Sequence, residues 1–306
     1  MQAVLLALVL SLALCFLVLR RLAEWFQQKG WTLFLPEEER RRPAIGGVLL
    51  AGGVLVSVIG GFVTAGIQQS LTGGFSAVCA GLVYALALGF MGSCDDYLQS
   101  VRRYDSGMPR LQRLVPEIGI ILAYLAVIGV AGQLSTRMDL PFLGMADWSY
   151  GYYPVVFVLL LLLTESVCRF GKRPGVLGAF FSGEAAGLAI GSLWLSQTVS
   201  AIVCAGLLGA AVVLWISEVH GFSAPTSGAA LFGAGILGAA ALGLDFPMVL
   251  LFALPVPLVG MLAEYAKQKG MWHLPNLSKR MQSILIFVIS LGFGALSAWA
   301  CSALSY

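Results

Sequence analysis

This sequence contains few charged residues. Only 11% of its 306 residues are charged, whereas 59% are hydrophobic and the mean hydropathy is +0.90. A soluble domain carries about 25% charged residues, so this composition excludes an ordinary soluble protein. We therefore predict an all-α, polytopic integral membrane protein, with one transmembrane domain over residues 1–306, no separate soluble domain and no nucleic-acid partner.

Patterned cysteines are also missing. The six cysteines are scattered, most of them inside apolar runs, and none belongs to a CxxC pair. Small buried side chains explain them better than disulfides or a zinc site would. We detect no internal repeat and no linker of low complexity, so the sequence gives no reason to divide the chain.

Apolar runs of about 20 residues, the length that a bilayer core requires, predict ten transmembrane helices. We interpret the first run as a retained helix rather than a signal peptide, because no basic stretch precedes it and no small-residue cleavage site follows it. The predicted spans are 3–19, 44–66, 75–93, 114–133, 150–167, 176–195, 198–216, 226–243, 247–265 and 282–304.

Basic residues fall on one side of these predicted spans. The loops 20–43, 94–113, 168–175 and 266–281 together hold 17 of the 18 lysines and arginines, and the opposite loops hold Arg137 alone. By the positive-inside rule, the basic loops are predicted to be cytoplasmic, which places both termini outside. The loop 20–43 is expected to be irregular or an interfacial helix.

Two adjacent carboxylates, Asp95 and Asp96, stand where the third apolar run ends. A charge at the edge of hydrocarbon is costly and marks a functional site by default. Successive helical residues point about 100° apart, so we expect only one of the two to meet a metal or substrate while the other supports it. The alternative is that both cap a helix end and pair with Arg102 or Arg103.

Asp95-Asp96-Tyr97-Leu98 is followed by Gly107, Gln112 and Arg113, and Pro43-x-x-Gly46-Gly47 stands at the cytoplasmic end of the second predicted span. With this spacing, the sequence resembles the polyprenyl-phosphate phosphosugar transferases, the family that includes the phospho-N-acetylmuramoyl-pentapeptide transferase of peptidoglycan synthesis. The resemblance implies transfer of a phospho-aminosugar from a UDP-sugar to undecaprenyl or another polyprenyl phosphate, in a bacterial plasma membrane and at its cytoplasmic face. It also implies Mg²⁺ as cofactor, with Asp95 and Asp96 as catalytic residues.

Later acidic motifs of the family are absent from this chain. No aspartate lies between Asp147 and Asp245, and Asn276 is the only asparagine. Pro225 stands where the family has a metal-binding aspartate. Because carboxylates and substrate phosphates hold Mg²⁺ together, these losses predict impaired catalysis.

Three glutamates in the predicted spans are candidate replacements. Glu165, Glu184 and Glu218 all lie toward the predicted cytoplasmic halves of their helices. Ionisable groups at such depth face a partner or a cavity, and Glu184 is the candidate metal ligand beside Asp95. The alternative is that each glutamate pairs with a nearby base, as Glu165 and Arg169 would at i,i+4.

Basic residues of three predicted cytoplasmic loops are candidate substrate-binding groups, because arginine binds phosphate in a bidentate fork. For Arg169, Lys172 and Arg173, determination of topology and contact with anionic lipid headgroups is the favoured explanation. The loop histidine, next to Trp272, has the alternative role of an interfacial anchor. The candidates are Arg110, Arg113, Arg169, Lys172, Arg173 and His273.

Three functions stay open on this evidence. The first is an active phosphoglycosyltransferase. The second, which the missing acids favour, is a non-catalytic relative that binds the lipid carrier or scaffolds partners. A transporter of unrelated type ranks last, because it predicts internal repeats and ionisable groups near the membrane midplane.

Overall fold

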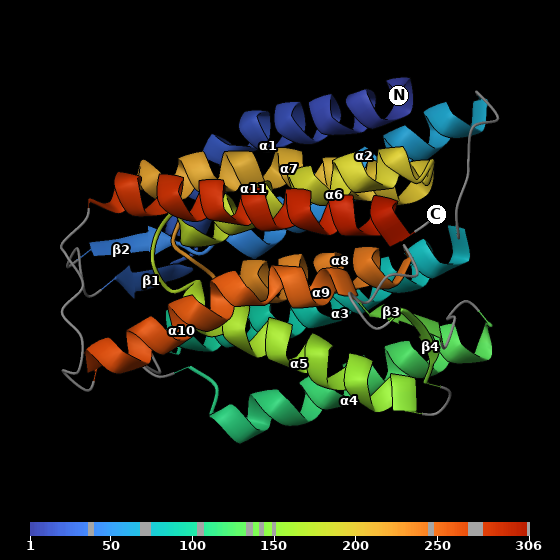
Figure 1. Cartoon of the computed structure of the whole chain (residues 1–306). Helices are drawn as coiled ribbons and strands as arrows, with labels where there is room; N and C mark the ends of the chain where they lie inside the picture. Colours follow the sequence, from blue (N-terminus) through green and yellow to red (C-terminus); the bar gives the residue numbers. More distant parts are fainter. Residues whose placement is uncertain are drawn as a thin grey trace.

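A computed structural model of the chain describes residues 1–35, 40–67, 75–102, 107–132, 137–140, 144–148, 151–243, 248–268 and 278–304. Most of the helices run side by side as one bundle (Figure 1). They are α1 (Gln2–Gln28), α2 (Gly46–Ile67), α3 (Phe75–Ser100), α4 (Arg110–Val130), α5 (Tyr152–Phe170), α6 (Val176–Trp194), α7 (Thr198–Val219), α8 (Ser227–Gly243), α9 (Met248–Ala253), α10 (Pro255–Gln268) and α11 (Lys279–Leu304).

The predicted all-α, polytopic membrane fold is confirmed. In the described part of the chain, nine segments are helical, long and apolar enough to cross a membrane, and α8 is a shorter apolar helix. Each predicted span corresponds to one helix or, for the ninth, to α9 and α10 together. Both termini lie at the same end of the bundle, as an even number of passes requires (Figure 1). The side of the membrane that this end faces stays a prediction.

The expectation for the loop 20–43 is wrong. α1 continues to Gln28 because Ala23 and Phe26 still bury their side chains. The chain then forms a hairpin of β1 (Thr32–Leu35) and β2 (Arg40–Pro43), in which Thr32 lies opposite Pro43. This hairpin lies at the basic end of the bundle, and a second one, β3 (Arg137–Leu140) with β4 (Gly144–Asp147), lies at the end of the termini (Figure 1).

The ninth predicted span is interrupted at Leu254. α9 ends at Ala253, and Pro255 and Pro257 open α10. Proline lacks the N–H that a helix interior needs and clashes with the preceding turn, yet it is well tolerated in the first turn of a new helix. Beyond the interruption, α10 diverges from α11 and packs against α5 (Figure 1).

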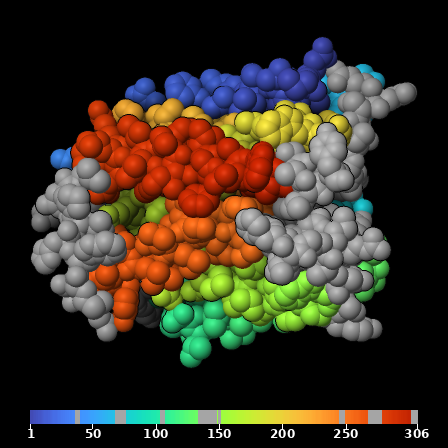
Figure 2. Space-filling view, viewed as in Figure 1, coloured from blue at the N-terminus to red at the C-terminus, as the bar shows by residue number. Residues whose placement is uncertain are grey.

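α8 forms the centre of the bundle. Every residue from Gly228 to Leu242 is buried, and the helix packs chiefly against α3, α2 and α5. Around it, α6 and α11 approach closely through glycines, since a Cβ on Gly187 would meet the backbone of Gly294. α11 (red) lies across the upper part of the face seen in Figure 2, and α10 (orange) and α5 (yellow-green) lie below it on the same face.

Candidate functional site

Asp95 and Asp96 meet the N-terminus of α8. The two carboxylate oxygens of Asp96 accept hydrogen bonds from the backbone N–H groups of Ser227 and Gly228, each at 2.8 Å. The Ser227 hydroxyl donates to Asp95 Oδ2, also at 2.8 Å. The first N–H groups of a helix have no partner within it and carry partial positive charge, so a carboxylate stabilises them. Asp96 therefore caps α8 from the neighbouring helix.

Asp95 and Asp96 both contact Ser227, and the expectation that only one of them meets a metal or substrate stays a prediction. Ser227 presents two donors, its N–H and its hydroxyl, and side chains that point apart can therefore reach the same residue. Glycines allow the close approach. A Cβ on Gly228 would lie 2.7 Å from Ser93 Oγ, and a Cβ on Gly92 would collide with the Ser227 carbonyl.

The remaining contacts of Asp95 hold the turn that follows α3. Asp95 Oδ1 accepts the Met108 N–H at 2.6 Å, and Oδ2 accepts the Gln99 side-chain amide at 3.1 Å. Gly107 adopts φ +65°, and a Cβ there would lie 2.5 Å from Asp95 Oδ1. All four carboxylate oxygens of the two aspartates thus accept hydrogen bonds from the protein itself. We call Asp95, Asp96, Met108 and Ser227 the aspartate cluster.

The alternative in which the aspartates pair with Arg102 is not observed. Arg102 is exposed and forms no ion pair with any residue that the structure describes, and Arg103 lies outside the described residues. Glu218 is likewise held by backbone rather than by a direct ion pair. Its carboxylate accepts the Gly175 N–H at 2.7 Å, while Arg42 donates to its carbonyl oxygen at 2.7 Å.

The structure does not bring Glu184 to Asp95. Glu184 lies on α6, which packs mainly against α7 and α11, whereas Asp95 lies on α3 against α8. Glu184 is fully buried, and neither of its carboxylate oxygens has a hydrogen-bond partner among the described residues, so the pairing alternative is wrong for Glu184 within these ranges. Over the described ranges, no group of three or more His, Cys, Asp or Glu residues could hold a metal ion.

A cavity of about 640 Å³ opens at the basic end, between β1, the start of α4, the end of α5 and α10. Five of the six predicted substrate-binding residues line it. The sixth, His273, lies outside the described residues. We call this cavity the basic pocket. Its lining is Leu35, Met108, Pro109, Arg110, Arg113, Arg169, Phe170, Lys172, Arg173, Pro174, Met261, Glu264 and Tyr265.

An acid outside the lining orients two of these arginines. Glu165 contacts Arg113 at 2.6 Å and Arg169 at 3.3 Å, which confirms the predicted i,i+4 pair and adds a second partner. Glu117, fully buried one turn further along α4, accepts a hydrogen bond from Thr164. The sequence analysis missed Glu117, although an acid within a predicted span and four residues after Arg113 was a usable signal.

Positive charge exceeds negative charge in the basic pocket. Arg173 pairs with Glu264, the acid of the lining, at 2.6 Å. Arg110 and Lys172 form no ion pair with any residue in the described ranges. An excess of guanidinium and ammonium groups on a concave surface attracts anions and binds them by charge-assisted hydrogen bonds.

The aspartate cluster and the basic pocket are adjacent in the fold. The Met108 N–H donates to Asp95, and the same residue lines the pocket, followed by Pro109 and Arg110. Asp95 therefore fixes the turn from which α4 and its arginines begin. This makes it a positioning residue for the pocket.

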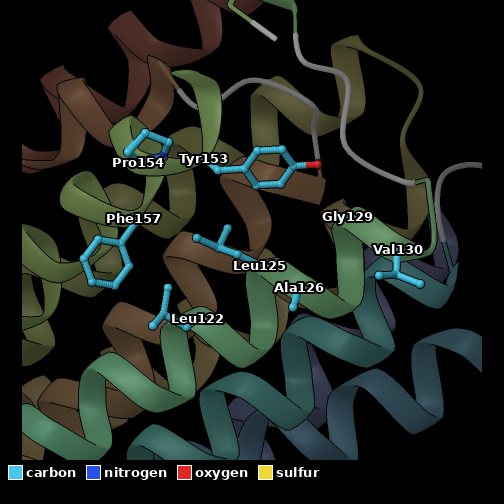
Figure 3. A pocket seen from close by; sticks show the side chains of 8 residues that line it. All are labelled: Leu122, Leu125, Ala126, Gly129, Val130, Tyr153, Pro154 and Phe157. Carbon is cyan, nitrogen blue, oxygen red and sulfur yellow. The ribbon is translucent and has the colours of Figure 1, made fainter. Parts of the chain in front are cut away.

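A cleft of about 600 Å³ lies between α4 and α5 at the opposite end of these helices. Its lining is apolar apart from the Tyr153 hydroxyl, with Leu122, Leu125 and Phe157 at one end (Figure 3). With no charged group in this lining, we assign it no chemistry. Comparison of the chain with protein-family models and with curated proteins found no match to either.

Proposed function

We propose that the protein binds the phosphate group of a polyprenyl phosphate in the basic pocket, as a non-catalytic relative of the phosphosugar transferases. Undecaprenyl phosphate in a bacterial plasma membrane is the expected ligand. The observation that carries the proposal is the convergence of five basic side chains, from the stretches 110–113 and 169–173, on one cavity. The described residues of its lining include a single acid.

The pocket provides for both parts of such a lipid. Arg113 and Arg169 are held in place by Glu165, so they lose little freedom when they bind phosphate. Arg110 and Lys172 form no ion pair with a described residue, so their charges are available to the phosphate. Apolar groups complete the lining, including Phe170, Met261 and Tyr265, and suit the first isoprene units beside the phosphate.

The state of the aspartate cluster supports a binding role over catalysis. Metal-assisted phosphoryl transfer depends on carboxylates that hold Mg²⁺ against the substrate phosphates. Here the oxygens of Asp95 and Asp96 accept hydrogen bonds from Met108, Gln99, Ser227 and Gly228. To bind the Asp96 oxygens, a metal would have to displace the N–H groups of Ser227 and Gly228 at the start of α8.

A binding titration tests the proposal. Purified protein in nanodiscs would be titrated with undecaprenyl phosphate, as wild type and as the double variant Arg110→Ala, Lys172→Ala. We expect the double variant to bind about tenfold more weakly or worse, a loss of about 1.4 kcal/mol or more. Arg102→Ala is the matched control, since this exposed arginine of the same end does not line the pocket. Equal affinities for wild type and double variant would contradict the proposal.

An activity assay separates binding from catalysis. The same preparations would receive Mg²⁺, undecaprenyl phosphate and a panel of UDP-aminosugars, and release of UMP would be followed. We expect no release from the wild type. Metal-dependent release that Asp95→Asn abolishes, while the variant still binds the lipid, would instead establish an active transferase with a rearranged site.

A further inference from the structure

A second depression at the basic end is apolar and shares no described lining residue with the basic pocket. It has a volume of about 470 Å³ and lies between the end of α1, the start of α2 and the end of α3. We call it the tryptophan groove. Its main lining residues are Phe26, Trp31, Val48, Phe90, Cys94 and Tyr97.

The tryptophan groove has a rigid wall and an open side. Trp31 packs edge-to-face against Phe26, with ring centroids 5.1 Å apart, and against Tyr97, with centroids 5.8 Å apart. On the other side, Val48 and Phe90 are 47% and 73% exposed on membrane-spanning helices. In a bilayer these two side chains face lipid, so the groove is open to an acyl chain.

A basic depression of about 490 Å³ continues from this groove. The two share Ser100 as a lining residue. Lys29, directly after α1, and Arg41 of β2 contribute two cations. Gly30, Thr32 and Val101 complete the lining that the described residues form, and none of these is an acid. A cationic surface at the membrane interface attracts anionic lipid headgroups.

We propose that this paired depression binds an anionic phospholipid of the surrounding membrane. Its phosphate contacts Lys29 and Arg41, and one of its acyl chains occupies the tryptophan groove. The paired depression is cationic at one end, polar at Ser100 and apolar at the other end. This order matches the headgroup, glycerol and acyl chain of a phospholipid. A zwitterionic lipid fits less well, because its own cation opposes the two basic side chains.

Such a lipid would also protect the aspartate cluster. Asp96 lines the tryptophan groove, and its carboxylate caps α8. An acyl chain in the groove keeps water away from these hydrogen bonds, which strengthens them. The inference is independent of the proposed function, since the two sites share none of the lining residues that the structure describes.

Lipid titration by native mass spectrometry tests the headgroup contact. Phosphatidylglycerol and phosphatidylcholine with the same acyl chains would be added to wild type, to the double variant Lys29→Ala, Arg41→Ala, and to Arg21→Ala. Arg21 is an exposed arginine of α1 outside both depressions. We expect phosphatidylglycerol to bind at least fivefold more tightly than phosphatidylcholine, and only the double variant to lose this preference. No preference in the wild type, or an equal loss in Arg21→Ala, would overturn the proposal.

Thiol labelling tests the position of the acyl chain. Cys94 lines the groove, whereas Cys79, half-buried on the same helix, does not. In the wild type, we expect phosphatidylglycerol to slow the alkylation of Cys94 by an apolar maleimide severalfold and to leave the alkylation of Cys79 unchanged. In Val48→Trp, where the new side chain fills the groove, we expect phosphatidylglycerol to give no such protection. Soluble glycerophosphoglycerol should give no protection. Protection of both cysteines, protection that survives Val48→Trp, or protection by the soluble headgroup would overturn the assignment.

Discussion

The aspartate cluster and the basic pocket lie side by side, but their polar groups are in opposite states. In the cluster, every carboxylate oxygen accepts a hydrogen bond from the protein, and the donors include the N-terminal N–H groups of a buried helix. In the pocket, Arg110 and Lys172 have no ion-pair partner within the described ranges, and basic groups outnumber acids. Of these two regions, only the pocket has polar groups, Arg110 and Lys172, that are available to bind a ligand.

This difference shows why buried charge alone does not identify a site. Asp95 and Asp96 are 4% and 6% exposed, which by itself indicates function in a membrane helix. Their hydrogen bonds explain the burial without a ligand, because an anion at the N-terminus of α8 stabilises the unpaired N–H groups there. By contrast, contacts among the described residues do not neutralise the excess of positive charge in the pocket.

The largest expected effect tests the structural role of the cluster. Asp96→Ala removes both acceptors from the N–H groups of Ser227 and Gly228. A hydrogen bond to a charged group contributes about 1.5–3 kcal/mol, so we expect the free energy of unfolding in mild detergent to fall by roughly 3 kcal/mol or more. Asp96→Asn keeps one acceptor oxygen and should lose about half as much. Wild-type stability of Asp96→Ala would refute the capping role.

A smaller loss is expected at Gly107, where the cluster meets the pocket. Gly107→Ala places a Cβ 2.5 Å from Asp95 Oδ1 at φ +65°. The left-handed conformation alone costs a non-glycine residue about 1–2 kcal/mol, measurable as a lower unfolding free energy. The shift of Met108 should also weaken lipid-phosphate binding. Gly119→Ala is the control, because nothing lies within 4 Å of its Cβ and alanine in a helix gains about 0.5–1 kcal/mol. Equal effects of the two substitutions would contradict the proposed geometry.

The sequence predicted the bundle and the lining of the pocket better than the role of the aspartates. Apolar runs of membrane length and the distribution of basic residues depend on local composition, so ten spans and one basic end could be predicted. The contact of Asp96 with Ser227 joins residues 131 apart in the chain. No local pattern encodes such a contact. The local cap of α8, in which the Thr226 hydroxyl accepts the Ala229 N–H at 3.2 Å, does not reveal the additional contact with Asp96.

Glu184 offers the converse test, since neither of its carboxylate oxygens has a hydrogen-bond partner in the part of the chain that the structure describes. A buried polar group without a hydrogen bond costs about 1–3 kcal/mol, so Glu184→Met should raise the free energy of unfolding by about 1–2 kcal/mol. Methionine keeps the length of the side chain and adapts to the glycine-lined contact with α11. Glu165→Met is the matched control and should destabilise the protein, because it leaves Arg113 and Arg169 without their acid. A loss of stability in Glu184→Met would mean that the carboxylate has a ligand or partner of its own.

The smallest expected effect concerns the balance of charge in the basic pocket. Glu165→Gln keeps the shape of the side chain and removes the negative charge beside Arg113 and Arg169. If the pocket binds phosphate through net charge, affinity for undecaprenyl phosphate should rise about threefold, or roughly 0.6 kcal/mol, and the gain should shrink in high salt. Glu24→Gln is the control, since this exposed acid pairs with Arg20 away from the pocket. A fall in affinity would show that the orientation of the two arginines by Glu165 outweighs the negative charge that it adds, because guanidinium forks bind phosphate only when held in one geometry.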